Sequence, residues 1–169
     1  MQAVRRLLAI LIVALTAIAA TAASARDVVP IRSGYPAGSI VVLTNQRTLL
    51  YVIGNGQAIR YPVGVGRAGM AWHGTASIDT MLIRPDWSPP RDIRRAEPHL
   101  PRVIAGGSPS NPMGEAVLGL NRGNYAIHGT NSPSSVGHFV SHGCIRMYNR
   151  DILDLYRRVG IGTRVYVLP

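Results

Sequence analysis

A short stretch late in the chain, residues 127–147, gathers most of the side chains that could do covalent chemistry. It holds three of the five histidines (His128, His138 and His142) and Cys144, the only cysteine among 169 residues. A cysteine thiolate attacks carbonyl carbons, and a neighbouring imidazole acts first as base and then as acid. Cysteine and histidine also bind zinc. The residue types alone therefore leave a nucleophilic site and a metal site open.

Spacing favours the nucleophilic site and assigns the base to His128. A free thiol has a pKa of about 8.5, and a nearby imidazolium lowers it. His128 precedes Cys144 by 16 residues and ends a predicted strand, a distance that suits a neighbouring strand or loop end. Gly143 permits a tight turn just before the nucleophile, and such turns expose backbone N–H groups that can form an oxyanion hole.

The metal alternative lacks the usual ligand spacing. Neither C-x-x-C nor H-E-x-x-H occurs, and Glu115 is the only carboxylate between Gly114 and Asp151. We therefore expect no metal and no cofactor. His138, next to Gly137, is predicted to be an ordinary loop histidine.

The first 25 residues have the pattern of an export signal. Arg5 and Arg6 are followed by the uncharged apolar run Leu7–Ala20 and by the A-x-A site Ala23–Ala25. The run is shorter than the roughly 20 residues that a transmembrane helix needs. We expect a mature chain 26–169, periplasmic or secreted, with no stable membrane anchor after cleavage. Because it carries one cysteine, no internal disulfide is possible, and the odd thiol is either reactive or an intermolecular partner.

The chain is strongly basic, with a formal net charge of +10 and a pI near 11. Such a charge favours anionic partners: nucleic acid, an anionic membrane surface, or an acidic polymer such as a cell wall. The sequence contains no arginine-rich helix and no aromatic–basic repeat, so we do not expect nucleic acid as a partner.

The elements that must position these residues are predicted to form one mainly β domain, residues 39–169. A short extended lead-in, residues 26–38, precedes this domain. Asn55-Gly56 predicts a hairpin turn, because both central positions of a type I′ turn need positive φ. Seven strands are expected: Ser39–Thr44, Thr48–Ile53, Gln57–Val63, Thr75–Ile83, Glu115–Leu120, Asn124–His128 and Thr163–Leu168.

One clear helix is expected after the reactive stretch. Asn149 is predicted as its N-cap, with Asp151 in the first turn, where the helix dipole favours an anion. Gly160 is predicted to end the helix. An apolar face at helical spacing is formed by Ile152, Leu155, Tyr156 and Val159.

Two other segments need an explanation. Gly64–Gly69 matches G-x-G-x-x-G, but no helical period follows it, so a glycine-rich turn between strands is favoured over a dinucleotide loop. Residues 84–114 hold seven of the twelve prolines. Because long loops in compact domains are usually functional or disordered, we expect an ordered loop over the site. Within it, Asp92–Ala96 is predicted to form a helical turn.

The reactive stretch resembles the signature of the L,D-transpeptidases of the bacterial cell wall, the YkuD-domain family. That signature is a histidine, a variable stretch, then [ST]-H-G-C followed by an apolar residue and Asn or Arg; here it is His128 and Ser141–Arg146. The resemblance covers roughly Ser39–Leu168. Further landmarks are Gly64–Gly74, Pro85–Pro90 and Asn111–Gly114.

The resemblance implies a β-sandwich of mixed sheets with one or two short helices, and acyl transfer from peptidoglycan stem peptides. Cys144 would attack the bond between diaminopimelate and D-Ala, and His128 would take the thiol proton. The backbone N–H groups of His142, Gly143 and Cys144 would hold the oxyanion. Gly129 would supply a carbonyl beside the base.

Substrate contacts are expected from Arg146, Ser141 and Gly129, with Arg146 either binding a stem carboxylate or serving the structure. The acceptor stays open: a second stem for a 3-3 cross-link, an outer-membrane protein, water or a D-amino acid. The family's acylation by carbapenems, which mimic the donor, is expected at Cys144. Two other classes remain: an L,D-carboxypeptidase or endopeptidase using the same residues, and a non-catalytic wall-binding protein with its cysteine in an intermolecular disulfide.

Overall fold

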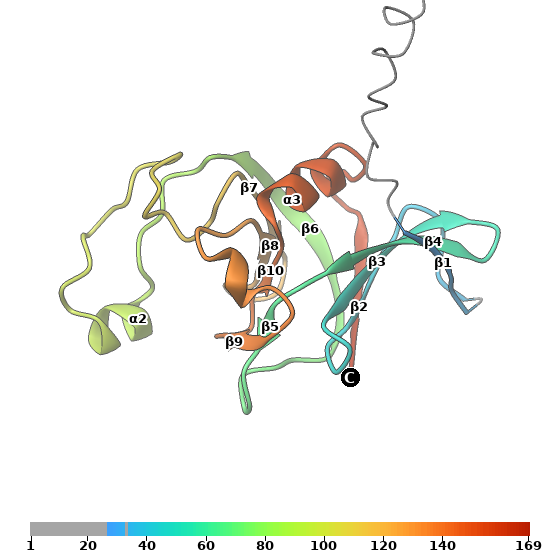
Figure 1. Cartoon of the computed structure of the whole chain (residues 1–169), viewed down its shortest axis with the longest axis horizontal. Coiled ribbons are helices and arrows are strands. Elements are labelled where there is room, and N and C mark those ends of the chain that lie inside the picture. Colours follow the sequence, from blue (N-terminus) through green and yellow to red (C-terminus); the bar gives the residue numbers. More distant parts are fainter. Residues whose placement is uncertain (1–26, 33) are drawn as a thin grey trace, which may run out of the picture.

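One continuous sheet of nine strands organises the computed structural model, which describes residues 27–32 and 34–169 (Figure 1). The order is β1-β4-β3-β2-β11-β6-β7-β8-β10, and a separate pair joins β5 to β9. The predicted export signal lies outside the described residues. The strands are Val28–Pro30 (β1), Ile40–Leu43 (β2), Thr48–Gly54 (β3), Gln57–Pro62 (β4), Val65–Gly66 (β5), Gly74–Ile83 (β6), Ala116–Leu120 (β7), Ala126–His128 (β8), Phe139–Ser141 (β9), Ile145–Arg146 (β10) and Arg164–Leu168 (β11).

The first half of the sheet is the predicted meander. β2 pairs with β3 and β3 with β4, both antiparallel. The β3–β4 hairpin turns at Asn55 and Gly56, whose φ values are +53° and +69°. Both lie in the left-handed region that a type I′ turn requires, so the hairpin prediction is confirmed. The lead-in prediction missed β1, which pairs antiparallel with β4.

Strand β6 links the two halves of the sheet. Its first residues, from Gly74, pair antiparallel with β11, and from Ile78 onward it pairs antiparallel with β7. A register shift between Ile78 and Thr80 marks the change of partner, and such irregularities bend a strand and increase its twist. The bend lets the second half, β7, β8 and β10, face the same core as the first.

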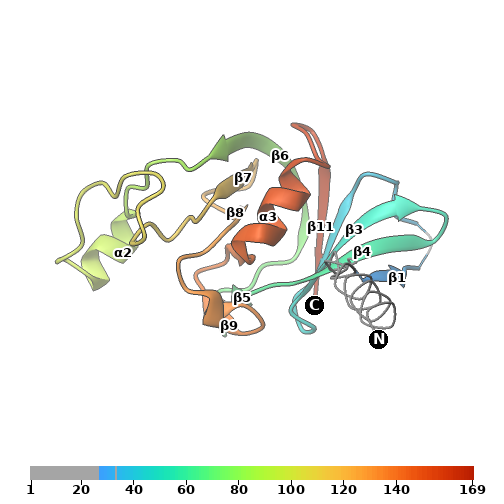
Figure 2. The same cartoon turned by 45° about the horizontal axis from the view of Figure 1, so that its top comes forward.

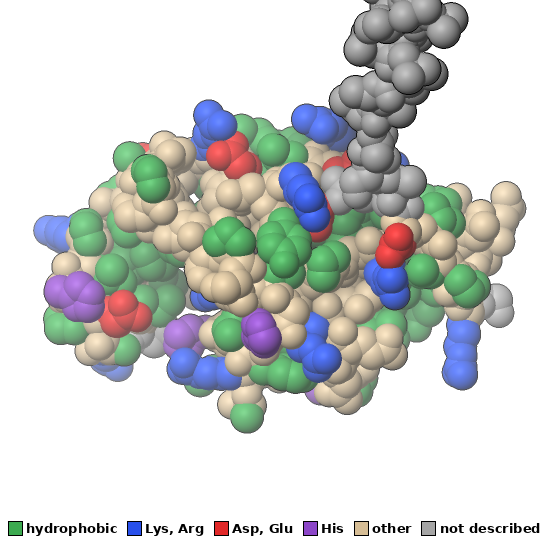
Figure 3. All heavy atoms as spheres, viewed as in Figure 1, with side chains coloured by type: hydrophobic (Ala, Val, Ile, Leu, Met, Phe, Trp, Pro, Cys, Tyr) green, Lys and Arg blue, Asp and Glu red, His purple; other side chains and the backbone are tan. Residues whose placement is uncertain are grey.

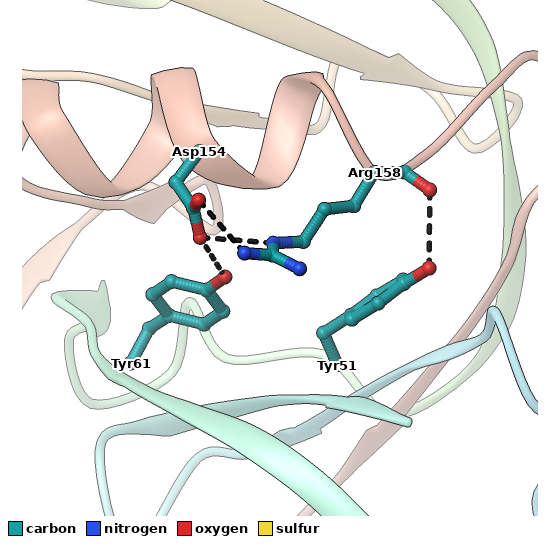
Figure 4. A network of polar contacts seen from close by, with 4 residues as sticks. All are labelled: Tyr51, Tyr61, Asp154 and Arg158. Carbon is teal, nitrogen blue, oxygen red and sulfur yellow. Dashed lines mark hydrogen bonds and ion pairs between the residues drawn. The ribbon is translucent and has the colours of Figure 1, made fainter. Parts of the chain in front are cut away.

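Helix α3, Asn149–Tyr156, packs between the two halves (Figure 2). It buries Ile152 and Leu155 in the main core cluster, which also contains residues of β2, β7 and β11. Two tyrosines of the sheet bind its far end (Figure 4): the Tyr61 hydroxyl donates to Asp154 at 2.5 Å, and the Tyr51 hydroxyl donates to the carbonyl of Arg158 at 3.1 Å. The helix is therefore fixed by both apolar and polar contacts.

The prediction of a mainly β fold with mixed sheets and one or two short helices is confirmed. Most pairs are antiparallel, while β11–β2, β10–β8 and β5–β9 are parallel. The predicted ends of α3 are wrong. Asn149 is not the N-cap but the first helical residue, after Tyr148, and its side chain contacts other segments. The helix ends at Tyr156, before Gly160, because the chain turns away to enter β11.

Residues 84–114 form an ordered loop on one side of the sheet, with the short helix α2, Arg91–Ala96. Trp87 and Ile104 exchange two backbone hydrogen bonds across its base, at 2.9 and 2.8 Å. Asn111, 1% exposed, ties the loop together from inside. Its Oδ1 accepts from the Met113 N–H, and its Nδ2 donates to three carbonyls, those of Pro85, Ile104 and Ala105.

Asn111→Ala should loosen this loop, because the Pro85 carbonyl and the Met113 N–H lose their partner, and the Ile104 and Ala105 carbonyls each lose one of two. Leaving buried polar groups unpaired costs about 1–3 kcal/mol. We expect a fall of that size in the free energy of unfolding, measured by urea denaturation, and faster protease cleavage within residues 84–114. Ser110→Ala, at an exposed position of the same loop, is the control. Unchanged cleavage in Asn111→Ala would contradict this role.

Candidate active site

A cleft of about 450 Å³ contains the predicted reactive residues. One wall is the 84–114 loop, which contributes apolar side chains and Glu97. The other wall is formed by β8 and the segment around β10, with His128, Cys144 and Arg146. The loop therefore covers the site, as the sequence predicts. The parallel pairing of β8 with β10 places Arg146 opposite His128 and brings the preceding Cys144 to the same cleft.

His128 is 2% exposed, and its ring is held in one tautomer. Its Nδ1 lies 2.6 Å from the carbonyl oxygen of Gly129, which can only accept a hydrogen bond. Nδ1 therefore carries the proton and donates, and Nε2 keeps its lone pair. An imidazole in this state is ready to accept a proton at Nε2. Gly129 itself is buried and is not among the residues that line the cleft. Its carbonyl orients the histidine, and its predicted substrate contact stays a prediction.

Burial keeps both members of this pair neutral. It lowers the pKa of His128 from 6.5 to about 4, against the opposing effect of the Gly129 carbonyl. Burial also raises the pKa of the Cys144 thiol, although an Ala126 backbone hydrogen bond and the charge of Arg146 act in the other direction. At neutral pH the free protein thus holds an uncharged thiol and an uncharged imidazole in the same cleft.

The turn before Cys144 is built by Ser141 and Gly143. Ser141 is 1% exposed; its hydroxyl donates to the Cys144 carbonyl at 2.6 Å and accepts from the Gly143 N–H at 3.0 Å. Ser141 therefore shapes the turn; it also lines the cleft, and its predicted substrate contact stays a prediction. The Gly143 N–H is already engaged, which leaves the N–H groups of His142 and Cys144 as oxyanion donors. Gly143 has φ +117°, and a Cβ there would collide with the ring of Tyr125.

Two arginines flank the turn. Arg146 is half-buried in the cleft wall, and burial lowers its pKa. Among the described residues its guanidinium forms no salt bridge. Arg67, in the turn after β5, lies 2.8 Å from Nε2 of the exposed His142. Because a guanidinium only donates, Nε2 accepts this hydrogen bond. The side chain of His142 thus faces Arg67 at the rim of the cleft.

Several residues around the site were not identified from the sequence. The indole of Trp72 donates to the Gly143 carbonyl at 3.0 Å. The Asn124 carbonyl lies 3.7 Å from the Cys144 sulfur. Asn149 Oδ1 accepts from the Thr130 and Glu115 N–H groups, at 3.0 and 3.2 Å, and so fixes the chain that follows His128. None of these residues belongs to a local motif, since each acts across a long sequence distance.

The G-x-G-x-x-G segment forms a turn in the structure. Gly66 ends β5 and a turn follows it, with no helix at the motif. A Cβ at Gly66 would collide with the backbone of Met70 and Ala71, so close packing of the turn explains this glycine.

Within residues 27–32 and 34–169, no three His, Cys, Asp or Glu side chains gather as a metal site.

With this geometry in place, the chain can be compared with known proteins. The model of the YkuD family, the L,D-transpeptidase catalytic domain, matches residues 37–167. The chain belongs to the L,D-transpeptidase (YkuD) family.

Its relatives and structural neighbours carry the same description. The probable L,D-transpeptidase YbiS of Escherichia coli is 37% identical over 136 residues, 76% of this chain and 43% of that protein. The putative L,D-transpeptidase YqjB of Bacillus subtilis is 48% identical over 69 residues, 38% of this chain and 39% of that protein. The chain thus spans less than half the length of these curated relatives.

Solved structures share the fold. An L,D-transpeptidase from Mycobacterium smegmatis has a TM-score of 0.61 at 17% identity, with 77% of this chain and 58% of that chain covered. L,D-transpeptidase 3 from Mycobacterium tuberculosis, in complex with a faropenem-derived adduct, has a TM-score of 0.59 at 17% identity, with 79% and 61% covered.

The lowered pKa of His128 predicts an acid-sensitive stability. The folded state resists protonation down to pH about 4, whereas the unfolded histidine takes up a proton below about 6.5. The unfolded state is therefore favoured increasingly as the pH falls from 6.5 to 4, by about 3 kcal/mol. His128→Gln lacks this titration. Between these pH values the free energy of unfolding should fall further in the wild type than in the variant; parallel pH profiles would contradict the assignment.

Proposed function

We propose that this protein is an exported peptidoglycan L,D-transpeptidase that works through a thioester on Cys144. The observation that carries the proposal is the cleft itself: one thiol, one imidazole whose Nδ1 is held by the Gly129 carbonyl, and one guanidinium lie on its walls. Tetrapeptide stems supply the acyl group. Membership of the L,D-transpeptidase family supports this substrate class.

Acylation follows from the neutral pair. As the Cys144 sulfur bonds to the carbonyl carbon of the diaminopimelate–D-Ala bond, Nε2 of His128 takes the thiol proton. The resulting imidazolium is stabilised by the Gly129 carbonyl at Nδ1. When the C–N bond breaks, His128 passes the proton to the leaving nitrogen, and D-Ala departs. An amine acceptor then attacks the thioester carbon and gives its proton to the same imidazole. As the C–S bond breaks, the imidazole returns that proton to the Cys144 sulfur.

Arg146 is proposed to bind a carboxylate of the donor stem. Its guanidinium lines the cleft beside Cys144, half-buried and with no salt bridge among the described residues. Arginine can form two parallel hydrogen bonds to a carboxylate, which fixes orientation as well as position. The remaining basic side chains are spread over the face shown in Figure 3, and they do not form one patch there.

Export across a membrane and release into the periplasm or medium belong to the same proposal. They rest on the signal pattern of residues 1–25. No helix within the described part of the chain is long and apolar enough to span a membrane. An amine on a second stem gives a 3-3 cross-link; an outer-membrane protein is the other acceptor considered.

The nucleophile is tested with a carbapenem. A relative's structure holds imipenem, and imipenem should form a single adduct on the wild type, visible by intact mass, and none on Cys144→Ala. His128→Ala should acylate about 10²–10⁴-fold more slowly, the usual value of general acid–base help. An adduct that persists without the thiol, or equal rates with and without His128, would refute the Cys–His assignment.

The same preparation separates the competing functions. Tetrapeptide stems incubated with an amine acceptor should give a cross-linked product and release D-Ala. Release of D-Ala that leaves only free tripeptide stems, with water as the acceptor, would identify a carboxypeptidase. A wild-type protein with no titratable thiol would identify a wall-binding protein whose cysteine is bound in a disulfide.

Arg146→Gln should weaken substrate binding. A charge-assisted hydrogen bond is worth about 1.5–3 kcal/mol, which corresponds to about a 10- to 100-fold rise in KM for a tetrapeptide stem. The effect on kcat should be smaller, because the contact is made before and during reaction. Arg164→Gln, on the exposed side of β11, is the matched control. An unchanged KM in Arg146→Gln would show that Arg146 serves the structure only.

A further inference from the structure

A buried hydrogen bond supports the turn that precedes the nucleophile, residues 141–144, which is called the nucleophile turn below. The indole Nε1–H of Trp72 donates to the carbonyl of Gly143 at 3.0 Å. Trp72 precedes β6 and is 71 residues away in sequence, so the contact is purely tertiary. Trp72 is 8% exposed, and an indole can only donate. The Gly143 carbonyl therefore has a fixed partner on the protein side of the turn.

The hydrogen bond from Trp72 fixes the direction of the Cys144 N–H group. The Gly143 carbonyl and the Cys144 N–H belong to one peptide unit, and the described chain has no cis peptide bond. In a trans peptide the two groups point in opposite directions. With the carbonyl held against Trp72, the Cys144 N–H points away from the indole. The Gly143 N–H and the Cys144 carbonyl are both bound to Ser141, so within the described chain the Cys144 N–H, like that of His142, is left for a ligand.

The indole is itself held in place. Its ring stacks on Tyr125, with centroids 5.2 Å apart and planes 7° apart, and the guanidinium of Arg122 lies 4.9 Å from its centroid on the ring face. Tyr125 also blocks any side chain at position 143. The residue before Tyr125, Asn124, has its carbonyl near the Cys144 sulfur. One rigid group thus connects the segment before β6, the start of β8 and the nucleophile turn.

We propose that Trp72 is a positioning residue for the oxyanion donor. By holding the Gly143 carbonyl, it fixes the Cys144 N–H toward the oxygen that becomes negative when the thiol adds to a carbonyl. The hydrogen bond also polarises the peptide unit and strengthens its N–H as a donor. The inference rests on the cysteine acyl transfer proposed above and adds a residue 72 positions before the nucleophile.

Two reactions of the same thiol separate this role from simple structural support. Acylation by imipenem develops an oxyanion: sulfur bonds to the lactam carbonyl carbon, the ring C–N bond breaks, and the thiol proton ends on the lactam nitrogen. Alkylation by iodoacetamide displaces iodide and develops no oxyanion. A loss of the donor should therefore slow acylation and leave alkylation nearly unchanged.

The variant is Trp72→Phe, which keeps an aromatic ring against Tyr125 and removes the N–H. Removal of an oxyanion donor costs about 10²–10³-fold. Misalignment should cost less, so we expect the ratio of acylation to alkylation rate constants to fall about 10- to 100-fold. Arg164→Gln is the control: Arg164 is exposed on β11, does not line the cleft and makes no contact with the indole, so its ratio should stay within about twofold of wild type.

The outcomes are distinct. An unchanged ratio in Trp72→Phe, or an equal slowing of both reactions, would overturn the positioning role. A wild type that alkylates but never acylates would instead overturn the proposed function. If Trp72→Phe does not fold, site-specific replacement of Trp72 by benzothienylalanine, which has sulfur in place of the N–H, retains the ring size and gives the same comparison.

Discussion

The parallel pairing of β8 with β10 is the constraint on which the site depends. It sets Arg146 opposite His128 and delivers Cys144 to the same cleft. Parallel neighbours cannot be joined by a tight hairpin, so the chain must cross over between them. The crossover contains a short 3-10 helix, Pro133–Ser135, and β9, which pairs with β5. The bend in β6 and the packing of α3 keep this small parallel pair against the core.

In the resting site the Cys144 thiol and the His128 imidazole are both uncharged. A thiolate and an imidazolium buried side by side would each lose hydration, and the structure instead favours the neutral pair. The proton then moves only when a carbonyl carbon is present to share the developing negative charge. Such an arrangement protects the thiol, since the neutral form is the less reactive one toward oxidants.

Local signals explain what the sequence could predict. Asn55-Gly56 and the β-branched runs identify the meander, and the spacing of His128 and Cys144 identifies the two reactive side chains. The short strands β5, β9 and β10 carry too few residues to show a period. Asn149 is a good cap by type, but its amide is used between segments. The contact of Trp72 with Gly143 depends on how β6 and β8 lie in space, which no local pattern encodes.

Strand β11 has a consequence for the order of folding. Arg164–Leu168 lies in the interior of the sheet, between β2 and β6. Its parallel partner, Ile40–Leu43, is synthesised more than a hundred residues earlier. The sheet cannot close until Arg164–Leu168 has been synthesised, because β2 and β6 are linked in the sheet only through this strand. Such non-local closure is slow. Under the export proposed above, this delay would keep the domain unfolded while the chain crosses the membrane.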